Sequence, residues 1–314
     1  LKRYVSAPYV PQGGLMQGGI LSPLLFIFYI RNLPRRHSTL FGFADDIALG
    51  VSTPAHENPA IQLSQDYQEI RDFLRERRIQ LSDTKIQVMF FGNTRKRFPY
   101  AYVEADGHRV TTCTQYKYLG IWLDNNLNWQ KFTLETVKNL KERINVIRRI
   151  SCCVRLSRKL IETFYCSYAR GYLNYIAPLL ITLAPHLQAR IESADCHGLR
   201  LCLGAFPRTT VAEIHQESTL QTFNMFLKKR ILQYGARLIF KPQLAPLLEC
   251  ILEHDGSELV RSWHEIWEYY AIPAAPNIRA AYAIINYRMR KTKHTWKYHP
   301  HSSLGLFCWT SRIS

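Results

Sequence analysis

The stretch Thr39-Leu40-Phe41-Gly42-Phe43-Ala44-Asp45-Asp46-Ile47-Ala48-Leu49-Gly50-Val51 places two adjacent carboxylates between two short apolar runs. Apolar runs that flank a short polar pair are typical of a β-hairpin, so strands are predicted at residues 39–44 and 47–51 with the aspartates at the tip. Adjacent like charges repel, and a bound divalent cation would offset that repulsion. An isolated Asp-Asp pair is more often only a soluble turn, so the surrounding sequence must decide.

The sequence before this hairpin combines a glycine-rich loop with a helix start. Residues 11–19 contain four glycines, which allow a loop backbone to approach a ligand closely. Ser22 is predicted as a helix cap and Pro23 as the first helical residue of an apolar helix over residues 24–33.

The sequence after the hairpin predicts one long helix and several strands. Leu63, Tyr67, Ile70 and Leu74 recur at helical spacing, which predicts an amphipathic helix over residues 59–77. Further strands are predicted at residues 86–91, 100–104, 108–112 and 116–123, with a two-residue turn at residues 106–107. Helices mixed with antiparallel strands indicate an α+β fold for this part.

From Asn128 onward the pattern becomes helical, so a domain boundary is predicted near residue 127. Two apolar stripes at helical spacing support this change. The first comprises Leu134, Val137, Leu140, Ile144 and Ile147, and the second comprises Leu160, Phe164, Tyr168 and Tyr172. We expect three regions, at residues 1–127, 128–240 and 241–314.

The chain is strongly basic and has enough apolar sequence to fold. Its 314 residues carry a formal charge of +17 and are 47% apolar, which suits about two domains and argues against a disordered tail protein. Nine lysines and arginines against two glutamates lie between Lys131 and Lys159, and residues 279–314 contain seven basic residues and no acid. A polyanionic partner is therefore expected, with nucleic acid ahead of an anionic membrane surface.

Cysteine usage and hydropathy point to a reducing compartment. The eight cysteines have no regular spacing, so no disulfide framework is expected. The longest apolar runs, at residues 24–30 and 172–184, are shorter than a bilayer span, so no membrane span is expected. We therefore expect the nucleus or the cytoplasm.

Several motifs, in order along the chain, resemble those of reverse transcriptases. Gln17-Gly18-Gly19-Ile20-Leu21-Ser22-Pro23-Leu24-Leu25-Phe26 resembles the template-contacting motif, and Phe43-Ala44-Asp45-Asp46 resembles the catalytic aspartate motif. Leu81-Ser82-Asp83-Thr84-Lys85 is similar to the lysine motif of the palm. Tyr116-Lys117-Tyr118-Leu119-Gly120 with Leu123-Asp124 resembles the primer-grip hairpin of non-LTR retrotransposon enzymes. Residues 199–208 are like a segment beyond the thumb of jockey-like elements.

The resemblance implies a fold and a role for each motif. It implies a partial polymerase palm with a primer-grip hairpin, an all-α thumb and a helical, basic and aromatic C-terminal region. Asp45 and Asp46 would be catalytic ligands of Mg²⁺ in a two-ion site. Lys85 would assist the leaving pyrophosphate, and this role is favoured over the alternative of a surface lysine after a turn.

The same resemblance implies the partners. Gln17 and Gly18 would lie under the nascent base pair, while Tyr118, Leu119 and Gly120 would hold the primer end, although an apolar Tyr-Leu-Gly strand could equally be core. The partners would be an RNA template, a DNA primer and deoxynucleoside triphosphates, and the basic helices would contact the duplex backbone without reading its sequence.

Some positions depart from the family pattern. Met16, Gly19 and Ser82 stand where proline, serine and asparagine are usual. The resemblance also implies a first catalytic aspartate on an upstream strand, whereas residues 1–11 contain no acid. We therefore expect an interior excerpt of a polymerase that does not polymerise by itself.

Other functions remain open at this point. A catalytically dead remnant could bind RNA or an RNA–DNA hybrid, and a group II intron maturase shares the glutamine loop and the aspartate pair. Zinc is not expected at His294, His299, His301 and Cys308, because their spacing matches no standard site, and Cys196, His197 and Cys202 are interpreted as buried helix. Residue types alone would allow a Ser/His/Asp triad, but no nucleophile-elbow motif is present.

Overall fold

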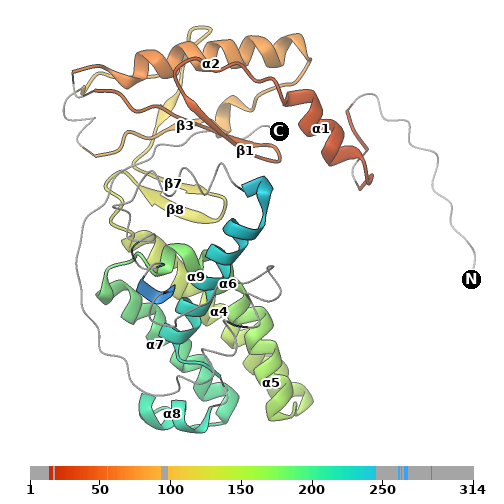
Figure 1. Ribbon diagram of the computed structural model, residues 1–314, viewed down its shortest axis with the longest axis vertical. Coiled ribbons are helices and arrows are strands. Elements are labelled where there is room, and N and C mark those ends of the chain that lie inside the picture. Colours follow the sequence, from red (N-terminus) through yellow and green to blue (C-terminus); the bar gives the residue numbers. More distant parts are fainter. Residues whose placement is uncertain are drawn as a thin grey trace, which may run out of the picture. The chain divides into compact units, whose positions relative to one another are not determined.

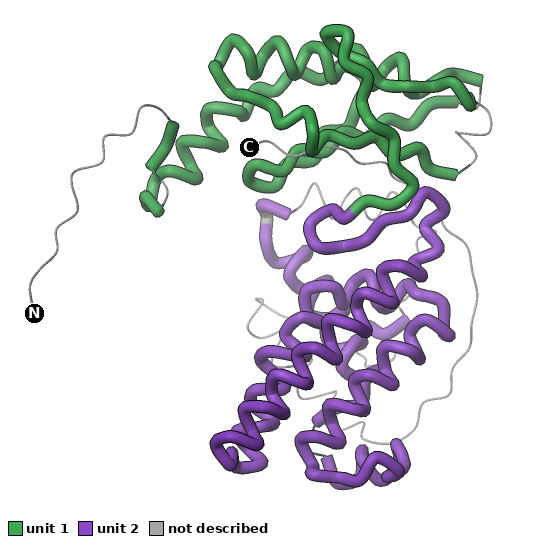
Figure 2. Tube along the Cα trace, turned by 180° about the vertical axis from the view of Figure 1, so that it is seen from behind, with its two compact units in different colours: residues 1–116, 306–314 green, residues 117–305 purple. Residues whose placement is uncertain are grey.

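The computed structural model describes residues 14–16, 18–54, 56–92, 98–218 and 220–244, with residues 261, 263, 265–267 and 284. These residues form two compact units, coloured separately in Figure 2: described residues up to Tyr116 make unit 1, and those from Lys117 on make unit 2. Both units contain helices and short strands, in agreement with the α+β prediction.

Unit 1 contains helices α1 and α2, the 3₁₀ turn η1 and short strands, several of which are labelled in Figure 1. Their bounds are α1 Ser22–Ile30, β1 Thr39–Phe43, β2 Asp46–Gly50, α2 Pro59–Glu76, η1 Asp83–Lys85, β3 Gln87–Val88, β4 Glu104–Ala105, β5 His108–Arg109 and β6 Thr111–Thr112. Strands β1 and β2 are antiparallel, as are β4 and β5, whereas β3 and β6 are parallel. The parallel pair was not predicted. In the sequence, the β4–β5 hairpin comes between β3 and β6 and reverses the chain, so that β6 runs in the same direction as β3.

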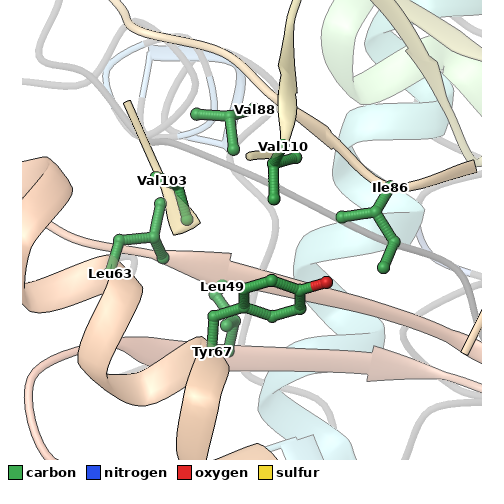
Figure 3. A pocket seen from close by; sticks show the side chains of 7 residues that line it. All are labelled: Leu49, Leu63, Tyr67, Ile86, Val88, Val103 and Val110. Atoms are coloured by element: carbon green, nitrogen blue, oxygen red, sulfur yellow. The ribbon is translucent and has the colours of Figure 1, made fainter. Parts of the chain in front are cut away.

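Helix α2 packs its predicted stripe into the core of unit 1. Leu63, Tyr67, Ile70 and Leu74 are all buried, which confirms the spacing argument. Figure 3 shows side chains from β2, α2, β3 and the neighbouring loops converging on one point. They leave a cavity of only about 10 Å³, which is too small for a substrate. This core therefore serves packing.

Unit 2 is a helical bundle preceded by one hairpin. Its elements are β7 Gln115–Tyr118, which starts at the unit boundary, β8 Ile121–Asp124, α4 Gln130–Val154, α5 Arg158–Phe164, the π-helical turn η2 Tyr165–Ala169, α6 Arg170–Leu180, α7 Pro185–Leu203, α8 Val211–Glu217, α9 Phe223–Phe240 and η3 Pro242–Leu244. The predicted single strand at residues 116–123 is wrong, because Leu119 and Gly120 both take positive φ and turn the chain between β7 and β8.

The first predicted apolar stripe of the bundle is largely in the core, but the second is not. Leu140, Ile144 and Ile147 of α4 are fully buried. In contrast, Leu160, Phe164 and Tyr168 are 49%, 41% and 41% exposed. The fully buried side chains of that segment are Tyr165, Ala169 and Leu173, one position further along.

A buried ion pair joins two helices of the bundle. The guanidinium of Arg170 on α6 donates to both carboxylate oxygens of Asp195 on α7, at 3.0 and 2.6 Å. The hydroxyl of Tyr165 donates to the backbone carbonyl of Asp195 at 3.0 Å and also to its carboxylate. Burial opposes the charge on Arg170, but the attraction of Asp195 outweighs it and raises the arginine pKa. Gly198 lies beside the Tyr165 ring, where a Cβ atom would come within 2.2 Å of it.

Two histidines should make the stability of unit 2 depend on pH. Burial and the charge of Arg170 lower the pKa of His215, and burial and Arg148 lower that of His197. Below about pH 6.5 the unfolded chain therefore binds more protons than the folded chain. The contribution of the two neutral histidines to the free energy of unfolding is fully present above that pH and is lost as the solution is acidified. We expect the urea midpoint of unit 2 to fall between pH 7.5 and pH 5.5.

Replacing His215 with leucine should weaken this pH dependence. Both ring nitrogens of His215 are buried without a hydrogen-bond partner among the described residues, so His215→Leu also removes two unsatisfied polar atoms. Urea unfolding at the two pH values should show a smaller difference for the variant. An undiminished difference would contradict the assignment to His215.

Candidate active site and nucleic-acid interface

The β1–β2 hairpin presents the two aspartates differently from the prediction. Phe43 pairs with Asp46, so the turn consists of Ala44 and Asp45, and Asp46 is already the first residue of β2. The predicted strand end at Ala44 is therefore wrong by one residue, as is the placement of both aspartates in the turn. Asp45 is exposed, whereas Asp46 is half-buried.

Ala44 carries backbone strain at this turn. Its φ of 54° lies in the left-handed region, which is unfavourable for a residue with a Cβ atom. Ala44→Gly should relieve that strain and stabilise unit 1 by about 0.5 kcal/mol after the larger chain entropy of glycine is subtracted. Thermal unfolding measures the change, with Ala44→Val as the opposite control; a glycine variant that melts below the parent would contradict the argument.

The aspartate pair suits a hard divalent cation. Mg²⁺ is held in proteins by one or two carboxylates together with substrate phosphates. No hydrogen bond or ion pair of the Asp45 carboxylate is found within the described ranges, so its oxygens are available to a ligand. Among the residues that the structure describes, no group of three or more His, Cys, Asp or Glu side chains could hold a metal. The hairpin thus offers part of a ligand set.

A buried carboxylate anchors the segment that leads into β1. Asp66 on α2 is fully buried and accepts backbone N–H bonds from Arg36, His37 and Ser38, together with the Ser38 hydroxyl. Burial alone would raise the pKa of Asp66, but the hydrogen bonds from Ser38, His37 and Arg36 outweigh it and lower the pKa. This contact fixes where the hairpin starts relative to α2.

Lys85 lies in unit 1, outside the β1–β2 hairpin. It is the last residue of η1, and its side chain is exposed. Asp83 in the same turn pairs with Arg71 of α2 at 2.6 Å, which ties η1 to the helix. Within the described ranges no ion pair joins Lys85 to Asp45. Its catalytic role stays a prediction.

The glycine-rich loop is described in part. Gln17 lies outside the described residues, and Gly18 takes a φ of 85°, which glycine adopts without strain. Ser22 is not the helix cap that was predicted: it is the first residue of α1, and its hydroxyl donates to the carbonyl of Met16 at 2.7 Å. A Cβ atom on Gly19 would lie 2.6 Å from that hydroxyl, so a larger residue at this position would require the Ser22 side chain to move.

The β7–β8 turn is fixed to the helical bundle. Tyr118 is 8% exposed, while Leu119 and Gly120 form the turn itself. The hydroxyl of Tyr175 on α6 donates to the carbonyl of Leu119 at 2.7 Å. The turn is therefore held in place, while the burial of Tyr118 keeps the core interpretation of that residue open.

Helix α4 carries much of the basic charge of unit 2. Its exposed cations include Lys138, Lys141 and Arg149, none of which has an ion-pair partner among the described residues. Lys131 lies over the Trp122 ring at 4.9 Å, and Arg148 contacts His197 at 2.8 Å. An exposed helix face with unpaired cations can contact phosphates.

The candidate-site residues of unit 1 lie in a segment that is similar to a known family. Residues 4–123 match the sequence model of the family described as "Reverse transcriptase (RNA-dependent DNA polymerase)". This segment is therefore similar in sequence to reverse transcriptases. The matched range includes the described part of the glycine-rich loop, the aspartate hairpin, Lys85 and the β7–β8 turn.

Two curated Drosophila melanogaster proteins are similar to this chain. One, named "Probable RNA-directed DNA polymerase from transposon X-element", is 24% identical over 146 residues, 45% of this chain and 16% of that protein. The other, named "Probable RNA-directed DNA polymerase from transposon BS", is 26% identical over 249 residues, 74% of this chain and 27% of that protein. The matches thus cover 16% and 27% of the length of these two relatives, and no solved structure matches the chain. These similarities support the non-LTR retrotransposon assignment.

The sequence patterns did not indicate two residues that hold parts of the candidate site in place, Asp66 of α2 and Tyr175 of α6. Asp66 is a polar residue on the buried side of α2, next to Tyr67 in the sequence. Its position on the same side as the apolar stripe is the only signal in the sequence that could have indicated a buried carboxylate. Tyr175 lies in an apolar run and carries no local signal for its bond to Leu119.

The remaining expectations concern metals and membranes. Cys196 and Cys202 of α7 are buried free thiols, whereas His197 is exposed, so the interpretation as buried helix is wrong for His197. The four C-terminal histidine and cysteine positions considered for zinc lie outside the described residues. Within the described ranges, no helix is both long and apolar enough to cross a bilayer.

Proposed function

We propose that the chain is part of the RNA-directed DNA polymerase of a non-LTR retrotransposon. Unit 1 would contribute the palm segment with the aspartate hairpin, and unit 2 the primer grip, the thumb and the helices beyond it. The observation that carries this proposal is the exposed Asp45 in a two-residue hairpin turn next to Asp46, inside the matched family segment.

Each residue has a role that its surroundings support. Asp45, with exposed oxygens, would bind the ion directly, and the half-buried Asp46 would support it from the start of β2. When bound, Mg²⁺ supplies charge neutralisation for phosphoryl transfer to the primer 3′-hydroxyl. Lys85 would carry positive charge or a proton toward the leaving pyrophosphate. Leu119 and Gly120 would hold the primer end, with their turn fixed by Tyr175.

The expectation that this chain does not extend a primer by itself stays a prediction. It follows from the resemblance, which implies a further aspartate on another strand for a two-ion site. Primer extension with an RNA template, a DNA primer, nucleotides and Mg²⁺ checks it. Asp45-dependent synthesis by the isolated chain would contradict it.

Binding of an RNA–DNA hybrid tests the function against the main alternative, a module that binds without catalysis. In EDTA, the negative charges of Asp45 and Asp46 near the phosphates repel the hybrid, so Asp45→Asn/Asp46→Asn should tighten binding by about three- to tenfold. In Mg²⁺ at equal ionic strength that advantage should vanish or reverse. Equal affinities of parent and variant in both buffers would favour the binding module. Asp72→Asn, an exposed aspartate on α2, is the matched control.

A further inference from the structure

A row of aromatic side chains is exposed along one side of α5, η2 and α6. Phe164 and Tyr168 are each 41% exposed, Tyr172 is half-buried and Tyr175 is 60% exposed. They follow one another at spacings of four, four and three residues, about one ring per helical turn. We call these four side chains the aromatic row.

The core does not explain this exposure. Tyr165, Ala169 and Leu173 of the same segment already fill the bundle interior and are fully buried. A π-helical turn spans Tyr165–Ala169, in the middle of the row. Such turns alter the direction of neighbouring side chains and are frequent at functional sites. The aromatic row is therefore a surface feature that the fold leaves uncovered among the described residues.

Three rings of the row are held in position. The guanidinium of Arg143 on α4 lies over Tyr168 at 4.6 Å and over Tyr172 at 5.1 Å, and it donates to the Tyr168 carbonyl at 3.0 Å. Asn139 donates to the Tyr172 hydroxyl at 3.4 Å. Tyr175 is held by its bond to Leu119. Rings that are already fixed lose little entropy when another planar group stacks on them.

The charge beside the row favours a polyanion. The segment Lys131–Lys159, which supplies Arg143, carries a formal net charge of +7, and Lys138 and Arg149 are exposed on it. Aromatic rings combined with basic side chains are the means by which proteins bind single-stranded nucleic acid. The bases of a duplex are stacked inside it and offer no free faces to such rings.

We propose that the aromatic row binds single-stranded RNA by stacking its bases. This inference rests on the proposed nucleic-acid-binding function and adds a second surface to it, distinct from the duplex contacts of α4. The row ends at the β7–β8 turn through Tyr175, so the bound strand would run along unit 2 from α5 toward that turn.

Fluorescence anisotropy with a labelled twelve-nucleotide oligouridine and with an RNA–DNA hybrid tests the proposal on the full chain. Phe164→Ala/Tyr168→Ala should weaken oligouridine binding by about tenfold or more, because each lost stacking contact costs a large part of the affinity. Hybrid binding should change by less than about twofold, since α4 keeps its cations. Phe164→Tyr/Tyr168→Phe, which keeps both rings, should bind oligouridine like the parent.

The outcomes separate this proposal from the function on which it rests. Failure of the parent to bind either probe would remove the proposed function. Hybrid binding with an unchanged oligouridine affinity in the alanine variant would overturn only the stacking proposal and would leave the row as a contact for another polypeptide. Equal weakening for both probes would also overturn it. Thermal unfolding of each variant checks that the bundle is intact.

Discussion

Arg170→Ala is expected to destabilise unit 2 by about 3–5 kcal/mol, because it leaves the Asp195 carboxylate charged and buried without its partner. Asp195 is fully inaccessible to solvent and Arg170 is 4% exposed, so water cannot replace the lost guanidinium without opening the core. The Tyr165 hydroxyl would remain as a donor, but it brings no charge. Urea unfolding followed by far-ultraviolet circular dichroism measures the loss.

Two variants separate the pair from simple loss of packing. Arg170→Met/Asp195→Leu removes both charges together and should cost much less than the single change, because no charge stays buried. Arg149→Ala, on an exposed position of α4, should change stability by less than about 0.5 kcal/mol. If Arg170→Ala were as mild as Arg149→Ala, the ion pair would not hold α6 and α7 together as described.

Affinity for an RNA–DNA hybrid is expected to fall about 500-fold between 50 and 200 mM salt. This value corresponds to about five phosphate contacts and a slope near −4.5 in a plot of log association constant against log salt. The unpaired cations Lys138, Lys141 and Arg149 of α4 should supply much of that slope. Changing all three to glutamine should therefore reduce the slope by about 2.7.

A matched triple variant controls for net charge alone. Arg190, Arg208 and Arg237 are exposed at other places in unit 2, so their conversion to glutamine removes the same formal charge. This second variant should keep most of the parent slope. Equal slopes for the two triple variants would contradict a contact surface on α4 and would indicate only a general attraction between the chain and nucleic acid.

Local sequence patterns predicted those elements that have a regular spacing of apolar residues or a characteristic turn sequence. The buried stripe of α2 and the Asp106-Gly107 turn were both predicted, because periodic burial and positive φ angles leave a direct mark on sequence. The exposed side of α5 was not predicted: its apolar stripe satisfies the helical period, yet the π-helical turn and the neighbouring Tyr165 place a different set of residues in the core. A period cannot tell which of two apolar faces the bundle buries.

The sequence predicted only those parts of the candidate site that are formed by neighbouring residues in the chain. The aspartate pair and the β7–β8 turn stand out in sequence, but the one-residue shift that moves Asp46 into β2 depends on the strained φ of Ala44. The anchoring of β1 by Asp66 and of Leu119 by Tyr175 joins residues 28 and 56 positions apart. No local pattern encodes such contacts.

Iron-directed cleavage of the backbone tests the central claim most directly. Fe²⁺ supplied in place of Mg²⁺, with ascorbate and peroxide, generates hydroxyl radicals that cut the chain beside a bound ion. With the hybrid bound, we expect cuts at residues 43–47 that Mg²⁺ suppresses by competition and that disappear in Asp45→Asn/Asp46→Asn but persist in Asp72→Asn. Cuts that persist in the double aspartate variant, or that fall only elsewhere in the chain, would contradict a metal site at this hairpin.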